Sequence, residues 1–278
     1  MARRRQRAAQ VAVSLPLPGD YHVHTRFSDG EGEPAQCVER ALALGLPQIG
    51  ISDHLTPAIL GAGGDWSIDH DCRHEYVGAV RAAAARHPEI TVLLGVEADY
   101  VPGAEDELAG LLGAHRFDYV IGGLHYVDGF SFDDDAARED PRWDDAASLY
   151  RRYYALVSGA AACGLFDVLA HLDYVMLWWR RTTVDISAAE DEALAAMAAH
   201  GVAVEVNTTG TLDAAGQMYP APGLLQRACR LGIPLVFGSD AHEVGQVGWQ
   251  FDAAVALARQ AGYRTSLELS SRTQQPLP

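Results

Sequence analysis

Histidine and acidic residues recur where short apolar segments of this chain end. Imidazole and carboxylate groups together are ligands that suit zinc, manganese or iron. If the segments are strands of a parallel barrel, their C-terminal ends all lie on one face of the barrel. Residues far apart in the sequence then become neighbours there. The pattern therefore predicts a metal site assembled from the whole chain. Its residues are His22, His24, His54, Glu97, His125, His171, Asp240 and His242.

The spacing within this set supports metal binding. The segments His22-Val-His24 and Asp240-Ala-His242 place ligand types on alternate residues, so both side chains of a pair point to the same side of a strand. Glu97 lies within an apolar strand, where a carboxylate is costly unless an arginine pairs with it or a metal binds it. The pair of histidines is a weak signal by itself, Glu97 is harder to explain without a metal, and the prediction rests on the joint pattern.

Single histidines are weaker evidence. A lone histidine at a strand end, such as His125 or His171, is more often a satisfied core residue, so each counts only as part of the joint pattern. We interpret the remaining five histidines as structural, because they lie on predicted helices or at helix ends. They are His70, His74, His87, His115 and His200.

The elements that would position these ligands alternate along the chain. Apolar segments of strand length are followed by helical patterns, which indicates βα units and a parallel sheet. We expect one domain over residues 19–270, folded as a closed or nearly closed α/β barrel, with an open doubly wound sheet as the alternative. The predicted strands are residues 20–24, 48–53, 92–97, 119–125, 168–171, 203–207 and 235–239. The predicted helices are residues 34–44, 69–86, 105–112, 144–163, 188–199, 223–230 and 249–261.

The two ends of the chain are predicted to lie outside this domain. Residues 1–18 are interpreted as a disordered basic tail, because their apolar stretch is interrupted and lacks the cleavage site of a signal peptide. Residues 271–278 are interpreted as a loose polar tail. No stretch approaches the roughly 20 apolar residues of a membrane helix.

Composition excludes several kinds of chemistry. All 21 basic residues among the 278 are arginine, which rules out Schiff-base chemistry, a P-loop lysine and a carboxylated-lysine metal bridge. The formal net charge of −16 disfavours nucleic acid as a partner. The four cysteines show no C-x-x-C spacing and fit free thiols in a reducing compartment, so we expect a cytoplasmic protein. The sequence does not indicate the oligomeric state.

Several motifs of this chain resemble those of the PHP (polymerase and histidinol phosphatase) family, and within it the monofunctional histidinol-phosphatases. The resemblance covers the chain from Asp20 to about Tyr263. General family motifs are matched by Tyr21-His-Val-His-Thr-Arg-Phe-Ser-Asp-Gly30, Ile51-Ser-Asp-His54, Gly95-Val-Glu97, Gly122-Gly-Leu-His125, Ala170-His-Leu-Asp173 and Gly238-Ser-Asp-Ala-His242. Motifs of the phosphatase branch are matched by Phe117-Asp-Tyr-Val-Ile-Gly122, Glu205-Val-Asn-Thr208 and Met218-Tyr-Pro220.

The resemblance implies a distorted seven-stranded (β/α)7 TIM-like barrel that holds three divalent ions, Zn, Mn or Fe, at the C-terminal ends of its strands. By analogy, His22, His24, Glu97 and Asp240 would hold one ion. Glu97 would bridge to a second ion held by His125 and His171. Asp29, His54 and His242 would hold the third.

The resemblance also implies hydrolysis of L-histidinol phosphate in histidine biosynthesis, because paired ions can activate water for an in-line displacement on phosphorus. Asp240 and His242 are candidates for the group that protonates the leaving alkoxide. Arg180 and Arg181, with Arg26 behind them, are candidates for binding the phosphate, and Asp128 for binding the cationic amino-alcohol. The alternatives are another small phosphate ester, a nucleic-acid end, or a non-catalytic metal-binding module.

Overall fold

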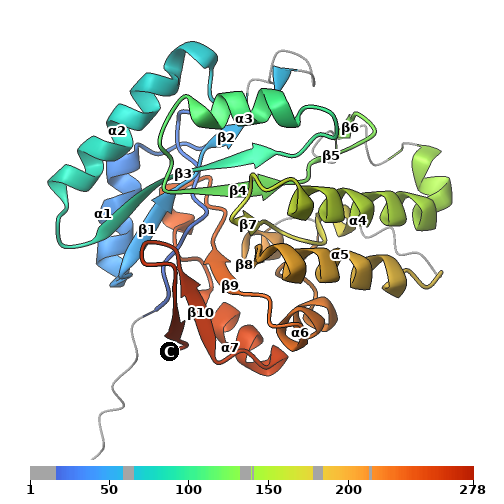
Figure 1. Cartoon of the computed structure of the whole chain (residues 1–278). Helices are drawn as coiled ribbons and strands as arrows, with labels where there is room; N and C mark the ends of the chain where they lie inside the picture. Colours follow the sequence, from blue (N-terminus) through green and yellow to red (C-terminus); the bar gives the residue numbers. More distant parts are fainter. Residues whose placement is uncertain (1–16, 59–65, 132–138, 140, 178–183, 213–214) are drawn as a thin grey trace, which may run out of the picture.

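The computed structural model describes residues 17–58, 66–131, 139, 141–177, 184–212 and 215–278. Its centre is a curved parallel sheet with the strand order β1-β3-β4-β7-β8-β9, and β2 pairs with the end of β3 (Figure 1). The strands are β1 (Gln48–Ile51), β2 (His54–Leu55), β3 (Thr91–Asp99), β4 (Tyr119–Gly123), β7 (Val168–Leu169), β8 (Ala203–Asn207) and β9 (Leu235–Gly238). Two further strands, β5 (Tyr126–Val127) and β6 (Phe130–Ser131), form a small hairpin after β4.

The extended segment 20–24 lies between the two outer strands of this sheet. On one side the amide of Ser52 donates to the carbonyl of Val23 over 2.9 Å, and the amide of Gly50 to that of Asp20 over 2.8 Å. On the other side the amide of Tyr21 donates to the carbonyl of Phe237 over 3.1 Å. The predicted first strand is therefore present as a bridging segment between β1 and β9, and the prediction of a distorted seven-stranded α/β barrel is confirmed.

Seven α-helices of the described chain follow the strands and lie outside the sheet (Figure 1). In α1, Pro34 stands in the first turn, and Glu33 and Gln36 form a capping box at its start. The helix ends at Gly45, whose φ of 72° a residue with a side chain rarely adopts. The helices are α1 (Pro34–Leu44), α2 (Arg73–Arg86), α3 (Glu105–Gly113), α4 (Ala146–Ala162), α5 (Ser187–His200), α6 (Pro222–Arg230) and α7 (Phe251–Ala261).

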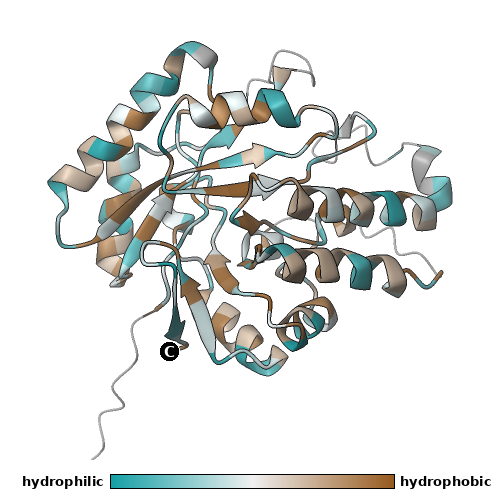
Figure 2. Ribbon diagram, in the orientation of Figure 1, coloured by the Kyte–Doolittle hydropathy of each residue, from teal (hydrophilic) through white to brown (hydrophobic). Residues whose placement is uncertain are grey.

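The apolar core has two parts, and Figure 2 shows apolar residues along the strands that separate them. The larger part lies between the sheet and the helices. The smaller part lies inside the barrel around Tyr119, whose hydroxyl donates to the carbonyl of Tyr21 over 2.6 Å. A Cβ at Gly50 or Gly95 would lie within 2.3 Å of the Tyr119 side chain, so both glycines make room for this ring. Apolar side chains therefore fill the interior of the barrel, and polar side chains are found at the end where the strands finish.

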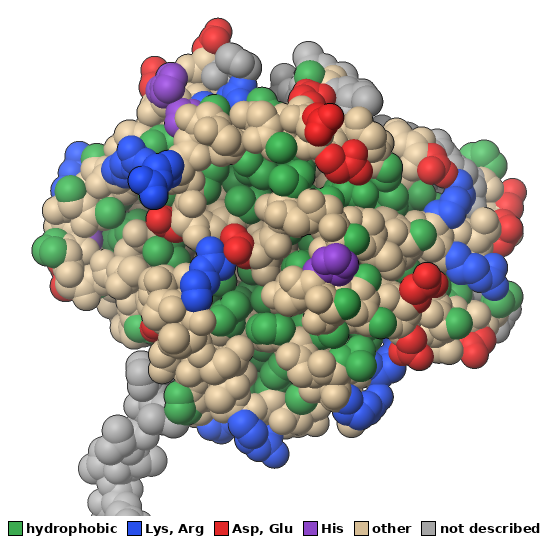
Figure 3. Space-filling model, in the orientation of Figure 1, with side chains coloured by type: hydrophobic (Ala, Val, Ile, Leu, Met, Phe, Trp, Pro, Cys, Tyr) green, Lys and Arg blue, Asp and Glu red, His purple; other side chains and the backbone are tan. Residues whose placement is uncertain are grey.

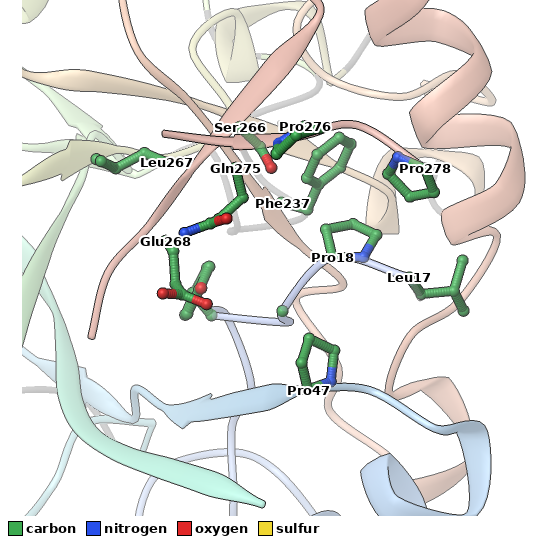
Figure 4. A pocket seen from close by; sticks show the side chains of 12 residues that line it. Leu17, Pro18, Pro47, Phe237, Ser266, Leu267, Glu268, Gln275, Pro276 and Pro278 are labelled. Carbon is green, nitrogen blue, oxygen red and sulfur yellow. The ribbon is translucent and has the colours of Figure 1, made fainter. Parts of the chain in front are cut away.

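The prediction of a loose C-terminal tail is wrong. Strand β11 (Thr273–Pro276) pairs antiparallel with β10 (Thr265–Glu268), and Leu277 behind it is buried. Backbone pairing does not need apolar side chains, and a polar, exposed edge strand such as β11 looks like a tail in the sequence. The hairpin covers a pocket of about 270 Å³ at the end of the barrel where the strands begin, lined by Pro18, Pro47, Phe237 and Leu267 among others (Figure 4).

The structure also bears on the predictions about the N-terminal tail, the cysteines and the charged surface. Residues 1–16 of the predicted basic tail lie outside the described residues, whereas Leu17 packs against the core. All four cysteines are free thiols, as predicted. No helix in the described part of the chain is long and apolar enough to cross a membrane. On the face shown in Figure 3, arginine side chains are dispersed among acidic ones.

Candidate metal centre

The structure brings the nine predicted ligands together at the C-terminal ends of the strands. They come from segment 20–24, the turn that follows it, and the ends of the strands β2, β3, β4, β7 and β9. All except Asp29 and His242 are buried. We call these residues the ligand cluster: His22, His24, Asp29, His54, Glu97, His125, His171, Asp240 and His242.

Glu97 lies at the centre of the ligand cluster. Its Oε2 atom is 3.1 Å from His22 Nε2 and 3.0 Å from His54 Nδ1. Its Oε1 atom is 3.0 Å from His171 Nε2. His24 and His125 each place Nε2 3.5 Å from one of the two oxygens. One buried carboxylate therefore faces five imidazoles, which is the geometry expected of a group that bridges two cations.

Two further groups of ligands flank Glu97. On one side, Asp240 Oδ1 lies 3.1 Å from His24 Nε2 and 3.5 Å from His22 Nε2. On the solvent side, Asp29 Oδ2 lies 3.3 Å from His242 Nε2 and 3.6 Å from His54 Nε2. Each group combines imidazole and carboxylate, which are ligands that divalent transition-metal ions accept.

The structure does not separate the ligands into three distinct sets, one for each ion, as the resemblance implies. His54 turns Nδ1 to Glu97 and Nε2 to Asp29, so its ring stands between two groups. His24 likewise places Nδ1 3.8 Å from Asp29 Oδ1 while Nε2 faces Asp240. The ligands are therefore shared between neighbouring groups, and the assignment of each histidine to one ion stays a prediction.

Unpaired buried atoms show that the ligand cluster fits cations. His22 Nε2, His24 Nε2, His54 Nδ1 and Glu97 Oε2 are buried, and the three nitrogens lie 3.0–3.5 Å from the oxygen, yet none of the four atoms makes a well-aligned hydrogen bond. Polar atoms that are removed from water without a partner are costly, and metal coordination would satisfy all four.

The pKa values of Glu97 and His24 also suit metal binding. Burial raises the pKa of Glu97, but His22, His54 and His125 outweigh burial and hold it well below its usual range. Burial together with the imidazoles of His54 and His242 lowers the pKa of His24 to about 3. The site thus keeps these carboxylates ionised and His24 neutral, as metal ligands need, whereas neighbouring carboxylates raise the pKa values of His22, His54 and His242, so a bound ion would have to displace protons from those rings.

Several buried polar residues orient the ligands, a role that the sequence pattern did not reveal. Asp99 Oδ1 lies 2.8 Å from His125 Nδ1, which leaves His125 Nε2 to face the cluster. Asp53 accepts the backbone amides of Thr25 and Ser28 over 2.7 and 3.1 Å, and so holds the turn that carries Asp29. Period-2 alternation along β3, which puts Asp99 on the same side as Glu97, is the sequence signal that could have found the first of them.

Aromatic side chains surround the cluster. The Trp66 ring is 4.7 Å from that of His54, edge to face, and it stacks on Tyr126 with 6.2 Å between centroids and 24° between planes. On another side, the Tyr174 ring lies 4.6 Å from that of His171 and 5.8 Å from that of Tyr219. No sequence motif singled out Trp66, because its packing partners are distant in the chain.

The predicted substrate-binding residues are not all in the described part of the chain. Arg180 and Arg181 lie outside the described residues. Arg26 is exposed, pairs with Glu33 and covers the ring of Phe27 at 4.2 Å. Asp128 pairs with Arg152 and, together with Tyr126, lines a pocket of about 240 Å³.

The chain is similar to several known proteins. The model of the family described as "PHP domain" matches residues 20–209. A Deinococcus radiodurans protein described as "Probable histidinol-phosphatase" is 36% identical over 259 residues, which cover 92% of this chain and 98% of that protein. The histidinol-phosphatase of Bacillus subtilis is 26% identical, over 84% of this chain and 97% of its own length.

A solved structure is also similar. The crystal structure of histidinol phosphate phosphatase from Lactococcus lactis, complexed with zinc, L-histidinol and phosphate, has a TM-score of 0.75 and 24% identity to this chain. The match covers 94% of this chain and 100% of the other. At this identity the likeness shows that the two proteins share a fold.

Proposed function

Because the chain belongs to the PHP domain family, we propose that it is a metal-dependent histidinol-phosphatase, which hydrolyses L-histidinol phosphate to L-histidinol and phosphate. The chemistry rests on one observation, the buried Glu97 carboxylate that faces five imidazoles within 3.5 Å. The choice of substrate is supported by the relative that is 36% identical over 98% of its own length.

The ligand cluster offers nine groups for three divalent ions. His22, His24 and Asp240 would hold one ion, His125 and His171 a second, and Asp29, His54 and His242 a third, with Glu97 between the first two. When bound, such ions would activate water at neutral pH and neutralise the charge of the phosphate oxygens. Zinc, manganese and iron all accept these ligands, so availability would decide among them.

The leaving alkoxide needs a proton donor, and His242 is better placed than Asp240. Asp240 is buried, and its Oδ2 already accepts from Asn207 over 3.1 Å. The side chain of His242 is 36% exposed, and its Nδ1 lies 3.0 Å from the Asp240 carbonyl, which leaves Nε2 to face Asp29 Oδ2 at 3.3 Å on the exposed side of the cluster. Nε2 cannot donate a proton and bind an ion at the same time, so catalysis by His242 would require the third site to be empty or its ligands to exchange.

The rest of the substrate would be bound by groups around the cluster. Arg180, Arg181 and Arg26 remain the proposed phosphate ligands. Asp128 remains the proposed partner of the ammonium group, and it shares its pocket with Tyr126 beside His125. We add Trp66 as the surface on which the imidazole ring of the substrate packs, because the half-buried indole lies directly against His54.

A panel of phosphomonoesters tests the function. The protein would be loaded separately with zinc, manganese or iron, and phosphate release would be measured from histidinol phosphate, glycerol phosphate and a short 3′-phosphorylated oligonucleotide. A strong preference for histidinol phosphate in kcat/KM is expected. Equal turnover of glycerol phosphate, or cleavage of the oligonucleotide, would reject the proposed substrate, and bound metal without any turnover would reject the enzyme.

Trp66→Ala tests the proposed contact with the substrate ring. We expect the KM for histidinol phosphate to rise about tenfold, because an aromatic pair contributes roughly 1 kcal/mol beyond the area it buries. The kcat should change little. Glycerol phosphate, which has no ring, is the matched control, and its KM should not respond; an equal rise for both substrates would place the effect on the metal ligands instead.

Metal binding should strengthen as the pH rises. Burial opposes the charge on His242, but Asp29 and Asp240 raise the pKa of its imidazole to about 9 in the metal-free protein. An ion can bind only the neutral ring, so below that pH binding must displace a proton, and affinity should rise by up to about tenfold per pH unit between about pH 6 and 8 for each proton displaced. Competition with a chelator measures this slope. His242→Asn should make the slope shallower by the contribution of one proton, while the raised pKa values of His22 and His54 keep it above zero. A slope near zero in the wild-type protein would contradict the prediction.

A further inference from the structure

Glu205 lies inside the barrel next to the ligand cluster. It is the middle residue of β8, and the alternation of the strand turns Ala203, Glu205 and Asn207 inward while the residues between them face the helices. Its side chain is 1% exposed. A carboxylate so deeply buried is costly unless its oxygens accept hydrogen bonds.

Both oxygens of Glu205 contact residues of the ligand cluster. Oε1 lies 2.8 Å from His22 Nδ1. Oε2 accepts the backbone amide of His171 over 3.1 Å and the side-chain amide of Asn207 over 2.9 Å. Since an ionised carboxylate only accepts, a proton of the His22 ring must lie on Nδ1, so Nε2, which faces Glu97, is the nitrogen that would bind an ion.

Asn207 extends this contact to a third ligand. Its Nδ2 also donates to Asp240 Oδ2 over 3.1 Å. Its Oδ1 accepts the backbone amide of Thr209 over 2.9 Å, which fixes the orientation of the side-chain amide. Glu205 is therefore connected, directly or through Asn207, to ligands that come from segment 20–24, from the end of β7 and from the end of β9.

Two features of the backbone agree with this role. A Cβ at Gly238 would lie 1.9 Å from Glu205 Oε1 and 2.6 Å from the His22 Cβ, so only glycine leaves room for the contact. His171 and Asp240 have positive φ values of 28° and 54°, which residues with side chains rarely adopt and which persist only when neighbouring groups hold them. The hydrogen bonds from Glu205 and Asn207 reach both of these residues.

We propose that Glu205 is a positioning residue, which sets the tautomer of His22 and holds His171 and, through Asn207, Asp240 in place for metal binding. This role rests on one part of the proposed function, the binding of metal by His22, His171 and Asp240. It does not depend on which phosphate ester the enzyme hydrolyses.

Glu205→Gln is the principal test. Glutamine keeps the shape but replaces one accepting oxygen by a donor, so it cannot accept from His22, His171 and Asn207 together. The affinity for Zn²⁺ or Mn²⁺, measured by competition with a chelator, should fall about 10- to 100-fold. Nitrogen NMR shifts of the histidines should show loss of the Nδ1–H form of His22. Activity at saturating metal should recover in large part, whereas a merely structural defect would not respond to metal.

Matched variants keep the test decisive. Asp167→Asn removes a carboxylate that accepts the amide of Val120 over 2.9 Å at the far end of the sheet, and metal affinity should stay unchanged. Gly238→Ala, which displaces Glu205 without altering it, should weaken metal binding as Glu205→Gln does. Because Asn207 acts through the same contacts, Asn207→Ala combined with Glu205→Gln should cost less than the two single effects together.

The outcomes separate this proposal from the proposed function. A folded Glu205→Gln protein that binds metal as tightly as the wild type, with the His22 tautomer unchanged, would overturn the positioning role. A wild-type protein that binds metal but does not hydrolyse histidinol phosphate would overturn the proposed function, and the difference in metal affinity between wild type and variant would still support the role of Glu205.

Discussion

Replacing Glu97 by glutamine is expected to lower kcat/KM by at least about 1,000-fold, a loss of about 4 kcal/mol of transition-state stabilisation. Glutamine fills the same space but has one neutral oxygen where the carboxylate turns two toward five imidazoles. It would not bridge two cations as a carboxylate can, and it would remove the negative charge that offsets the charge of ions bound there. Steady-state kinetics with histidinol phosphate, together with metal analysis of the purified variant, would measure the effect.

The control for this prediction is Glu89→Gln. Glu89 precedes the same strand, its side chain is 56% exposed and it contacts His87 at the far end of β3 from the cluster. Its replacement should leave both metal content and activity unchanged. If Glu97→Gln retains more than about a tenth of the wild-type kcat/KM, a loss of less than about 1.4 kcal/mol, the bridging role of Glu97 is wrong.

The second large effect is expected from His125→Ala. The variant loses one of the two imidazoles on the Oε1 side of Glu97, so the ion on that side should be lost or weakly held. We expect at least about a 100-fold fall in activity at limiting metal. Metal analysis should show that one ion is lost while the others remain. Full activity of this variant would contradict the assignment of His125 as a ligand.

Two companion variants show whether the His125 effect is specific. Asp99→Asn disturbs the contact with His125 Nδ1 while keeping the imidazole, so its effect on metal affinity should be smaller, about tenfold. His115→Ala removes a histidine that packs against His74, away from the cluster, and should change nothing. An equal loss in all three variants would indicate a general loss of fold.

Local sequence signals determined several elements of the fold to the residue. Helix α1 runs from Pro34 to Leu44 as predicted, because a proline in the first turn and a glycine after the last act on their own neighbours. Strand β8 also has its predicted bounds. The C-terminal strand β11 could not be found in this way, since it depends on pairing with β10 and on the burial of Leu277 against the core.

The convergence of the candidate ligands was also open to prediction, because parallel strands of a barrel all end on one face. How those ligands divide was not. His54 turns its two nitrogens toward different carboxylates, and the positive φ of His171 and Asp240 aims their side chains. The supporting residues Asp99, Glu205 and Asn207 likewise act on partners far away in the chain.

The amino-acid sequence alone therefore determined which residue types stand at the strand ends and that they would meet. It did so because helix caps, strand alternation and barrel geometry depend on local chemistry and on chain direction. The tertiary structure alone decided which atom faces which, how His24 and His54 are shared, and that Glu205 lies against His22. Those relations depend on side-chain rotamers and on distances of a few tenths of an ångström between segments far apart in the chain, and only the packing of the whole barrel sets them.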